Sequence, residues 1–453
     1  MKSKNHYDIC IIGAGASGLA AALEAADKAS EARILLLEKN DAPGRKIRAT
    51  GNGRCNISNL QAENSENALA FLRKWGIATR TYPTGLIYPY SESAADVADL
   101  LTRQVEASGV ELWTNATVTG LESHSTECME SSREAASRAT NRRSGKKWEK
   151  TKTQVEPAAS NAESETSAGA KGNFTIQIEE NGNQHTFTAH SVILATGGKA
   201  GPQYGTIGDG YRLLRKLGHT VRSTIPVLTP VDCAEADCKD LAGTRAKGHI
   251  LLCRKSPDGW TDIFGEEGEI QFTASGLSGI CVFNMTRHMR YDRDEGLDVF
   301  RMAIDLCPDL DARAFLREQR DAARKGRRSV AASDVMASLL KKKLVKIIFR
   351  RAEISEDISL ADLSDSDIES LASQIHELTF RPTGVRGWKE AQCTSGGVLL
   401  DELDPETGES GICPGLYVTG ELQDYDGPCG GYNLNHAWNT GAAAGRAAGL
   451  AEL

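Results

Sequence analysis

The stretch "YDICIIGAGASGLAAALEAADK", residues 7–28, decides the fold. It opens on a mainly apolar run, which is typical of a strand buried on both faces of a parallel sheet. Gly13, Gly15 and Gly18 follow as G-x-G-x-x-G and lead into an alanine-rich helix. A second strand, "RILLLEK", ends on Glu38. The pattern predicts a βαβ unit of the Rossmann type.

Each glycine of this motif has its own role in such a unit. The first allows a tight turn, the second lets a pyrophosphate approach the backbone, and the third lets helix and strand pack closely. The helix N-terminus adds free N–H donors and a partial positive charge, worth about 0.3–1 kcal/mol per interaction. Glu38 stands where it would accept hydrogen bonds from an adenosine ribose. We therefore expect a bound dinucleotide rather than a plain tight turn.

Two downstream segments bear on which dinucleotide is bound. "SVILATGG" is an apolar strand that ends on small residues, and "GLYVTGELQ" is a strand followed by an acidic turn. No second G-x-G-x-x-G follows a strand between residues 200 and 380, so a separate NAD(P)H-binding domain is not expected. Three cofactor-contacting segments spread along the chain favour an extended FAD, with NAD(P)H at most a transient donor.

A fourth segment, "GRKIRATGNGRCNIS" at residues 44–58, has no helical period and no strand alternation. It offers few apolar groups for a core, and its glycine, arginine and asparagine content is typical of a ligand-facing loop. An exposed basic loop is the alternative interpretation.

Several of these segments together resemble a known family. "GRKIRATGNGRCNISN", "ATGG", "TSGGV" and "GELQDYDGPCGGYNLNHAWNTG" are similar to the bacterial BaiN-type flavoproteins, relatives of aminoacetone oxidase within the two-dinucleotide-binding-domain superfamily. The resemblance covers nearly the whole chain outside residues 122–172. It implies an α/β fold: a Rossmann-like FAD-binding domain with an inserted β-rich domain and a helical subdomain. It also implies that residues 44–58 wrap the flavin.

The motifs and the resemblance together predict the cofactor-binding residues. They are Gly13, Gly15, Ala16, Ser17, Gly18, Glu38, Lys39, Arg45, Lys46, Thr50, Gly51, Asn52, Gly53, Cys55, Asn56, Thr196, Gly197, Gly198, Gly420, Glu421, Gly431, Asn433 and Leu434. By the resemblance, Glu421 takes the place of the acid that binds the ribityl or diphosphate part of FAD, where aspartate is commoner. N–H groups at the start of the last helix would face the flavin N1–C2=O edge.

Catalytic candidates are Asn52, Tyr432 and His436. Asn52 could hydrogen-bond the polar edge of the flavin ring. His436 could act as an acid or base, or could be a packed or capping histidine. Cys55 and Cys429 lie in the flavin-proximal segments, but we expect no C-x4-C redox dithiol in this chain, so both are predicted to be small buried thiols.

Composition limits the partners. The 453 residues carry a net charge of -8, which gives no electrostatic footprint for nucleic acid or an anionic membrane. Eleven cysteines without C-x-x-C spacing indicate neither a zinc site nor a disulfide framework, and favour a reducing cytoplasm. No apolar run reaches the roughly 18 residues of a membrane span. We expect no metal, no nucleic acid and no membrane partner; the oligomeric state is not readable.

The pattern of elements predicts three structural units. The clearest expected helix is "VMASLLKKKLVKIIFRRAEI". The predicted units are residues 1–203 with 395–453 as the FAD-binding domain, including a disordered insertion at 122–172, then 204–308 with 377–394 as a β-rich substrate domain, and 309–376 as a helical subdomain.

The sequence therefore predicts an FAD-dependent oxidoreductase that transfers hydride between a small organic substrate and flavin. NAD(P)H or oxygen would be the other redox partner. A tRNA-modifying flavoenzyme is one alternative, which the acidic balance disfavours. A flavin-binding sensor or scaffold without turnover is another. The substrate itself is not identified by any motif.

Overall fold

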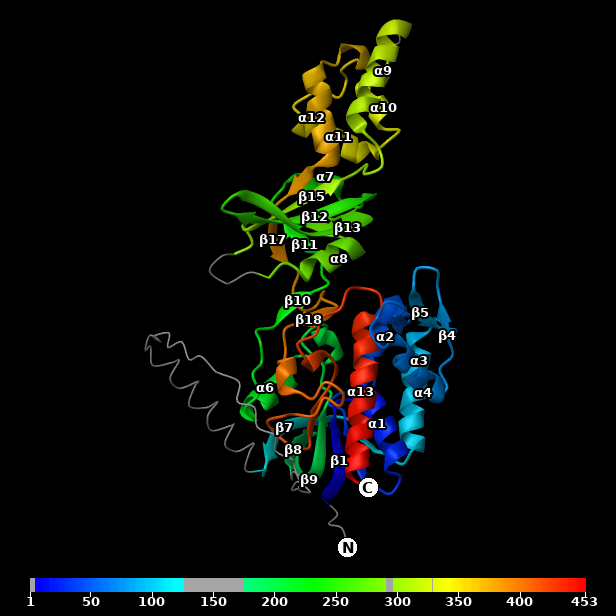
Figure 1. Cartoon of the computed structure of the whole chain (residues 1–453), viewed down its shortest axis with the longest axis vertical. Helices are drawn as coiled ribbons and strands as arrows, with labels where there is room; N and C mark the ends of the chain where they lie inside the picture. The colour runs from blue at the N-terminus through cyan, green and yellow to red at the C-terminus, as the bar shows by residue number, and fades with distance from the viewer. Residues whose placement is uncertain (1–4, 126–173, 291–295, 328) are drawn as a thin grey trace, which may run out of the picture. The chain divides into compact units, whose positions relative to one another are not determined.

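The computed structural model describes residues 5–125, 174–290, 296–327 and 329–453. The expected disordered insertion lies almost entirely outside these residues. The chain divides into two compact units (Figure 1). Unit 1 comprises residues 1–224 and 396–453, and unit 2 comprises residues 225–395. Unit 2 is thus inserted into the chain of unit 1.

A seven-stranded sheet forms the centre of unit 1, in the order β6–β2–β1–β9–β8–β7, with β19 also paired to β9. Its parallel strands are β1 (His6–Ile12), β2 (Ile34–Leu37), β6 (Glu111–Trp113), β9 (Asn183–Leu194) and β19 (Leu416–Val418). β7 (Ala116–Ser123) and β8 (Phe174–Glu180) continue the sheet in antiparallel fashion. The predicted Rossmann-like fold class is confirmed.

Two helices from opposite ends of the chain pack together on this sheet, α1 (Ala16–Lys28) and α13 (Tyr432–Ala451) (Figure 1). Their backbones approach closely because α13 carries glycine at the contact. A Cβ on Gly441 would lie 2.2 Å from the Ser17 carbonyl oxygen, and one on Gly445 would lie 2.2 Å from that of Ala21. The first and last segments of the chain are therefore held side by side.

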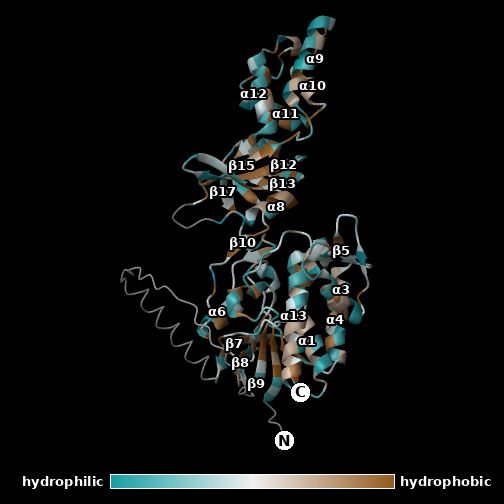
Figure 2. Cartoon of the chain, in the orientation of Figure 1, coloured by the Kyte–Doolittle hydropathy of each residue, from teal (hydrophilic) through white to brown (hydrophobic). Residues whose placement is uncertain are grey.

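Smaller elements complete unit 1. α3 (Ser65–Lys74) and α4 (Ala94–Ala107) extend the helical layer, and α6 (Asp209–Lys216) contributes Tyr211 and Leu214 to the core on the other side of the sheet. β3 (Ser58–Asn59), β5 (Leu86–Pro89) and β4 (Thr79–Thr81) form a separate three-stranded sheet. In Figure 2 the central strands of unit 1 are brown, as expected for strands buried between two layers.

Residues 44–58 are more regular than the sequence indicates. Arg45–Ala49 form a short helix, α2, and Thr50–Gly53 form a 3-10 turn in which Gly51 and Asn52 are left-handed, so only part of this segment is the irregular loop that its pattern indicates. Ile47 is buried and α2 packs against α4. Five residues are too few to display a 3.6-residue period, which is why the pattern was not visible.

Unit 2 is built on an antiparallel sheet in the order β16–β15–β12–β13–β14–β11–β17. Its long central pair is β12 (Arg245–Ser256) and β13 (Gly259–Phe272). The remaining strands are β11 (Val231–Cys233), β14 (Gly276–Ser278), β15 (Phe300–Asp305), β16 (Leu378–Phe380) and β17 (Pro382–Val385), and a separate pair joins β10 (Ile225–Val227) to β18 (Cys393–Ser395).

The helices of unit 2 share one apolar core with its sheet. They are α7 (Asp237–Leu241), α8 (Ile280–Thr286), α9 (Ala312–Gly326), α10 (Ala332–Met336), α11 (Lys342–Arg351) and α12 (Asp365–His376). Leu344 and Ile375 from helices and Phe272 from the sheet belong to the same buried cluster. The single helix expected over residues 335–354 is wrong, because the chain is extended at Lys341 and Leu340 turns inward between α10 and α11.

Two observations bear on membrane spans and on disulfide bonds. No helix within the described part of the chain is long and apolar enough to cross a membrane. Cys413 is disulfide-bonded, whereas nine other described cysteines are free thiols. One disulfide-bonded cysteine beside nine free ones is not the dense disulfide framework of a small secreted domain.

Candidate functional site

The predicted motifs converge at one edge of the unit 1 sheet. The carboxyl ends of parallel strands meet at a common edge, where ligands bind in doubly wound folds. Backbone hydrogen bonds tie the segments that leave these ends: Gly13 N donates to the Leu37 oxygen at 2.7 Å, and Thr419 N donates to the Leu194 oxygen at 3.0 Å. The G-x-G turn, the acid after β2, the loop after β9 and the turn after β19 are thus neighbours.

Glu38 is held under the G-x-G turn. Its Oε2 accepts a hydrogen bond from Ala14 N at 2.9 Å, and its Oε1 accepts two from Asn40, from the backbone N at 2.9 Å and from Nδ2 at 2.6 Å. The carboxylate is buried, with three donors fixing its orientation. Asn40 was not singled out from the sequence, and its place two residues after the acid was the available signal.

The three glycines of the motif differ in what a side chain at their position would meet. A Cβ on Gly13, at φ +102°, would lie 2.6 Å from the Ala195 oxygen, and one on Gly18 would lie 1.8 Å from the Gly13 oxygen. Both are required by the protein's own packing. A Cβ on Gly15 would meet nothing within 4 Å, and its φ of -81° suits any residue. The space beside Gly15, at the start of α1, is open for a ligand.

The loop after α2 has an unusual backbone. Gly51 and Asn52 have φ of +58° and +55°, and Cys55 has φ of +60°. Side-chain-bearing residues rarely adopt this region, and such strain gathers at functional sites. Asn52 and Gly53 are exposed on the loop, while Thr50 Oγ1 donates to the Ile47 oxygen at 2.6 Å.

Cys55 lies beneath that loop with no exposed surface. Burial raises the pKa of Cys55 to about 11, so the group is a neutral thiol near pH 7. The expectation that the chain has no C-x4-C pair is wrong, because Cys233 and Cys238 have this spacing in unit 2. A hydrogen bond between these two thiols raises the pKa of Cys233 and lowers that of Cys238.

The same loop is joined to the start of the last helix. Ser58 Oγ lies 2.8 Å from Asn435 Oδ1, and Asn59 Nδ2 donates to the Gly430 oxygen at 3.2 Å. A Cβ on Gly431 would lie 2.4 Å from the Ser58 oxygen, so only glycine permits this approach. Segments separated by about 370 residues in sequence therefore form one wall.

All three basic side chains predicted to bind cofactor have protein partners. Lys46 Nζ lies 2.5 Å from Glu421 Oε2, which joins α2 to the turn after β19. Lys39 Nζ lies 2.6 Å from Asp209 Oδ2, and the exposed Arg45 donates to Asn40 Oδ1 at 3.0 Å.

Other predicted residues line the neighbouring turns. Asn56 lies against Gly51, since a Cβ on that glycine would be 2.9 Å from Asn56 N. Gly197 and Gly420 have φ of +71° and +62°. Gly198 is buried beside them.

The N-terminus of α13 is braced by the glycine-rich loop before it. Asn433 Oδ1 accepts from Gly427 N at 2.8 Å, and Asn433 Nδ2 donates to the Gly427 oxygen at 2.9 Å. Tyr432 Oη donates to Gln61 Oε1 at 3.3 Å. Leu434 packs against the core beneath, so the first turn of this helix is fixed in place.

His436 is stacked on Tyr425, with ring centroids 3.9 Å apart and an interplanar angle of 13°. Burial lowers the pKa of His436 to about 4, so the imidazole is neutral at pH 7. Its Nε2 is buried and has no hydrogen-bond partner among the described residues, and the same is true of Thr196 Oγ1. Unsatisfied buried polar atoms are costly, and a bound ligand could supply the missing partners.

The observations so far fit an extended dinucleotide. Open space faces Gly15 at a helix N-terminus, an acid is fixed at the end of β2, and two buried polar atoms lack partners. All the cofactor-binding and catalytic residues predicted from the sequence lie in unit 1. Tyr425, which stacks on His436, was missed, although it stands within the quoted "QDYDGP" turn.

Comparison with known proteins agrees with this geometry. A family model described as HI0933-like protein Rossmann domain matches residues 7–68 and 146–447. The chain belongs to the HI0933-like family. The resemblance read from the sequence is thereby confirmed, as is the expectation of a flavoprotein oxidoreductase.

Three relatives match this HI0933-like chain over nearly its full length. The 3-dehydro-bile acid delta(4,6)-reductase of Clostridium scindens is 31% identical, covering 97% of this chain and 98% of the relative. The ribosomal RNA dihydrouridine synthase of Escherichia coli is 27% identical over 96% of each chain. The synthase of the same description from Haemophilus influenzae is 25% identical, also over 96% of each.

These relatives leave the nature of the substrate open. One relative is named for a small molecule, a bile acid, and the other two are named for ribosomal RNA. The absence of a nucleic-acid partner stays a prediction.

Proposed function

We propose that this protein is an FAD-dependent reductase that saturates a carbon–carbon double bond conjugated to a carbonyl group, with NAD(P)H as the electron donor. The loop that carries Asn52 supports this best. Its residues Gly51, Asn52, Gly53 and Cys55 are left-handed, and the chain that follows is fixed to the start of α13, where Ser58 Oγ lies 2.8 Å from Asn435 Oδ1. The relatives support the reaction type: a delta(4,6)-reductase and a dihydrouridine synthase both add two hydrogens across a ring double bond.

The cofactor would extend along the carboxyl edge of the sheet. Gly15 and the N-terminus of α1 would receive the pyrophosphate, and Glu38 the adenosine ribose. Glu421, paired with Lys46, would face the ribityl chain or diphosphate. When bound, FAD would accept hydride from the donor and pass it to the substrate. Thr196 Oγ1 would find in the cofactor the partner it lacks.

Three side chains would act near the reacting atoms. The Asn52 amide, exposed on a strained loop, would hydrogen-bond the carbonyl edge where negative charge develops. The Tyr432 hydroxyl, which donates to Gln61 in this state, would supply the proton that accompanies the hydride. His436 is neutral, so we assign it hydrogen bonding through Nε2 and not proton donation as an imidazolium.

Our first candidate substrate is a small cyclic enone. A second candidate, a uracil base in ribosomal RNA, is favoured by a lysine cluster in unit 2. Lys341, Lys342, Lys343 and Lys346 are all exposed at the start of α11. Cations at a helix N-terminus oppose the helix dipole, and bound phosphates would relieve that repulsion.

Anaerobic stopped-flow separates these candidates. The purified holoprotein is first reduced with NADPH or NADH, and bleaching of the flavin is recorded. Reduced protein is then mixed with a 4-ene-3-ketosteroid or with unmodified ribosomal RNA, and recovery of flavin absorbance is followed. Rapid recovery with the steroid alone supports the small-molecule assignment, and recovery with RNA alone supports the second candidate. A flavin that no donor bleaches would contradict the reductase and support a non-catalytic scaffold.

The cellular location is also part of the proposal. Nine free thiols among the described cysteines suit a reducing compartment, and we therefore propose the cytoplasm.

A further inference from the structure

A cluster of metal-ligating side chains lies at the amino-terminal edge of the unit 1 sheet, opposite the edge that carries the candidate cofactor site. His6 and Asp8 are two residues apart on β1, so their side chains project from the same face of the strand. His190 lies on β9, which pairs with β1 in parallel register. His6 aligns with Thr188 and Ile9 with Ser191, which makes Asp8 and His190 direct neighbours.

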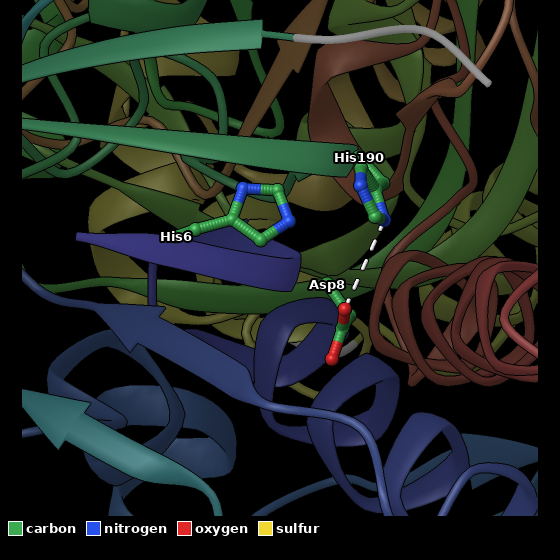
Figure 3. A group of neighbouring side chains, drawn as sticks. All are labelled: His6, Asp8 and His190. Carbon is green, nitrogen blue, oxygen red and sulfur yellow. Dashed lines mark ion pairs between the residues drawn. The ribbon is translucent and has the colours of Figure 1, made fainter. Parts of the chain in front are cut away.

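The three side chains offer ligand atoms that all lie within 4.8 Å of one another. Figure 3 shows them turned toward a common space between the two strands. His190 Nδ1 lies 3.8 Å from Asp8 Oδ1. His6 Nδ1 lies 2.9 Å from Thr188 Oγ1, which orients the ring. Arg33 N donates to Asp8 Oδ2 at 2.8 Å, which orients the carboxylate. Such outer contacts are the kind that position metal ligands.

A further carboxylate beside His190 comes from the residue that follows α13. Glu452, the residue that caps α13, places Oε2 3.3 Å from His190 Nδ1. The side chains of Asp8 and Glu452 are each only 5% exposed. Two buried carboxylates thus approach the same imidazole nitrogen, so a cation bound beside that nitrogen would be attracted to both.

We propose that His6, Asp8, His190 and Glu452 bind a divalent zinc ion that ties the first strand of unit 1 to the end of its last helix. Two imidazoles and two carboxylates suit tetrahedral zinc, whose bonds to nitrogen and oxygen are about 2.0–2.2 Å. Ligand atoms in such a site lie about 3.3 Å apart. The Glu452–His190 distance already matches this. The ligand atoms of His6, Asp8 and His190, which lie within 4.8 Å of one another, must close by at most about 1.5 Å.

The ion would be structural. Four protein ligands leave no open coordination position for substrate, and the cluster lies at the end of the strands away from the loops that would hold FAD. The competing explanation is a protonated His190 that bridges the two carboxylates without any metal. The two explanations differ in what a metal titration shows.

The test uses the purified FAD-loaded chain, stripped with a chelator, desalted and titrated with zinc chloride. Bound zinc is measured by elemental analysis after gel filtration. We expect one zinc per chain, together with a higher melting temperature because the ion binds only the folded state. Cobalt(II) should give the visible absorption of a tetrahedral site without the near-ultraviolet thiolate band that coordination by cysteine would produce.

Variants assign the ion to the cluster. His190→Ala and Glu452→Gln should each lose the zinc and its thermal shift, while FAD content reports that unit 1 is folded. His185→Gln is the matched control, since His185 lies on the same strand beside Glu180 and outside the cluster. It should bind zinc as the parent does. A parent that takes up no zinc overturns the proposal, and so does equal uptake by both cluster variants or a cobalt spectrum with a thiolate band.

Discussion

The two units of this protein have comparable cores but differ in how much their sequences reveal. Unit 1 contains the glycine turns, the acid after β2 and the loop with left-handed residues. Each of these features can be recognised from a short stretch of sequence. Unit 2 holds an antiparallel sheet and helices around one apolar cluster. A site for a dinucleotide phosphate or flavin ring restricts which residue type can stand at each neighbouring backbone position. An apolar core accepts many combinations of side chains of similar volume.

Glycines illustrate the difference. In unit 2, a Cβ on Gly248 would lie 2.4 Å from the Asp305 oxygen, and one on Gly276 would lie 2.0 Å from that of Val231. Both are needed for strand packing alone. In unit 1, the position of Gly15 has open space and an ordinary φ, so the protein's own packing gives no reason for glycine there. A glycine of this kind points to a ligand.

The largest effect is expected from replacing Gly15. Gly15→Val should abolish FAD retention while leaving the fold intact, because the side chain fits the protein and fills the space assigned to pyrophosphate. Flavin absorbance after gel filtration and circular dichroism together measure this. Gly387→Val in unit 2 is the control, since Gly387 also has nothing within 4 Å of its Cβ. Full FAD occupancy in the Gly15 variant would remove the cofactor assignment.

A large-to-small substitution in the core of unit 2 should affect stability and leave cofactor binding unchanged. Phe272 is fully buried and packs on Phe380 with ring centroids 5.9 Å apart. Phe272→Ala should lower the free energy of unfolding of unit 2 by about 3–5 kcal/mol. FAD content should not change, because unit 1 has its own core clusters. Denaturant unfolding followed by circular dichroism and by flavin release measures both. Trp260→Ala, at an exposed side chain, should have little effect.

The loop that carries Asn52 gives the next effect. Asn52→Ala should keep FAD but slow flavin reduction or reoxidation by roughly a hundredfold, since losing one positioned donor costs about 2.7–4 kcal/mol of barrier. Stopped-flow absorbance measures the rates. Asn181→Ala is the matched control, because Asn181 has a similar positive φ of +50° in the turn between β8 and β9. Equal rates in parent and Asn52 variant would mean that the loop is a passive cover.

The smallest effect concerns acid sensitivity of unit 1. The pKa of His436 is about 4 in the folded chain, below its ordinary value of 6.5. Between these values the unfolded chain binds the proton more readily, so acidification destabilises the fold. This loss amounts to at most about 1.4 kcal/mol per pH unit. His436→Phe should keep the stack on Tyr425 and flatten the decline. Unfolding measured by flavin release from pH 7 to pH 4 tests this, and an unchanged slope would contradict it.

Much of unit 1 was determined by sequence alone. The order of strand, G-x-G turn, helix and acid in residues 7–38 specifies the Rossmann βαβ unit, and the loops after β9 and β19 follow the same logic. These features depend on local backbone geometry and on the period of apolar residues, which sequence carries directly. The short helix α2 and the break between α10 and α11 were missed, since both depend on packing against distant elements.

Only the tertiary structure decided which distant residues meet. It pairs Lys46 with Glu421, joins Ser58 to Asn435 and places His190 between Asp8 and Glu452. It also stacks Tyr425 on His436 and leaves the Nε2 of that histidine buried without a partner among the described residues. Such contacts join positions that strand order and helix packing bring together, and no periodicity along the chain encodes them. Burial then sets the protonation of these groups, because the surrounding dielectric is a property of the folded chain.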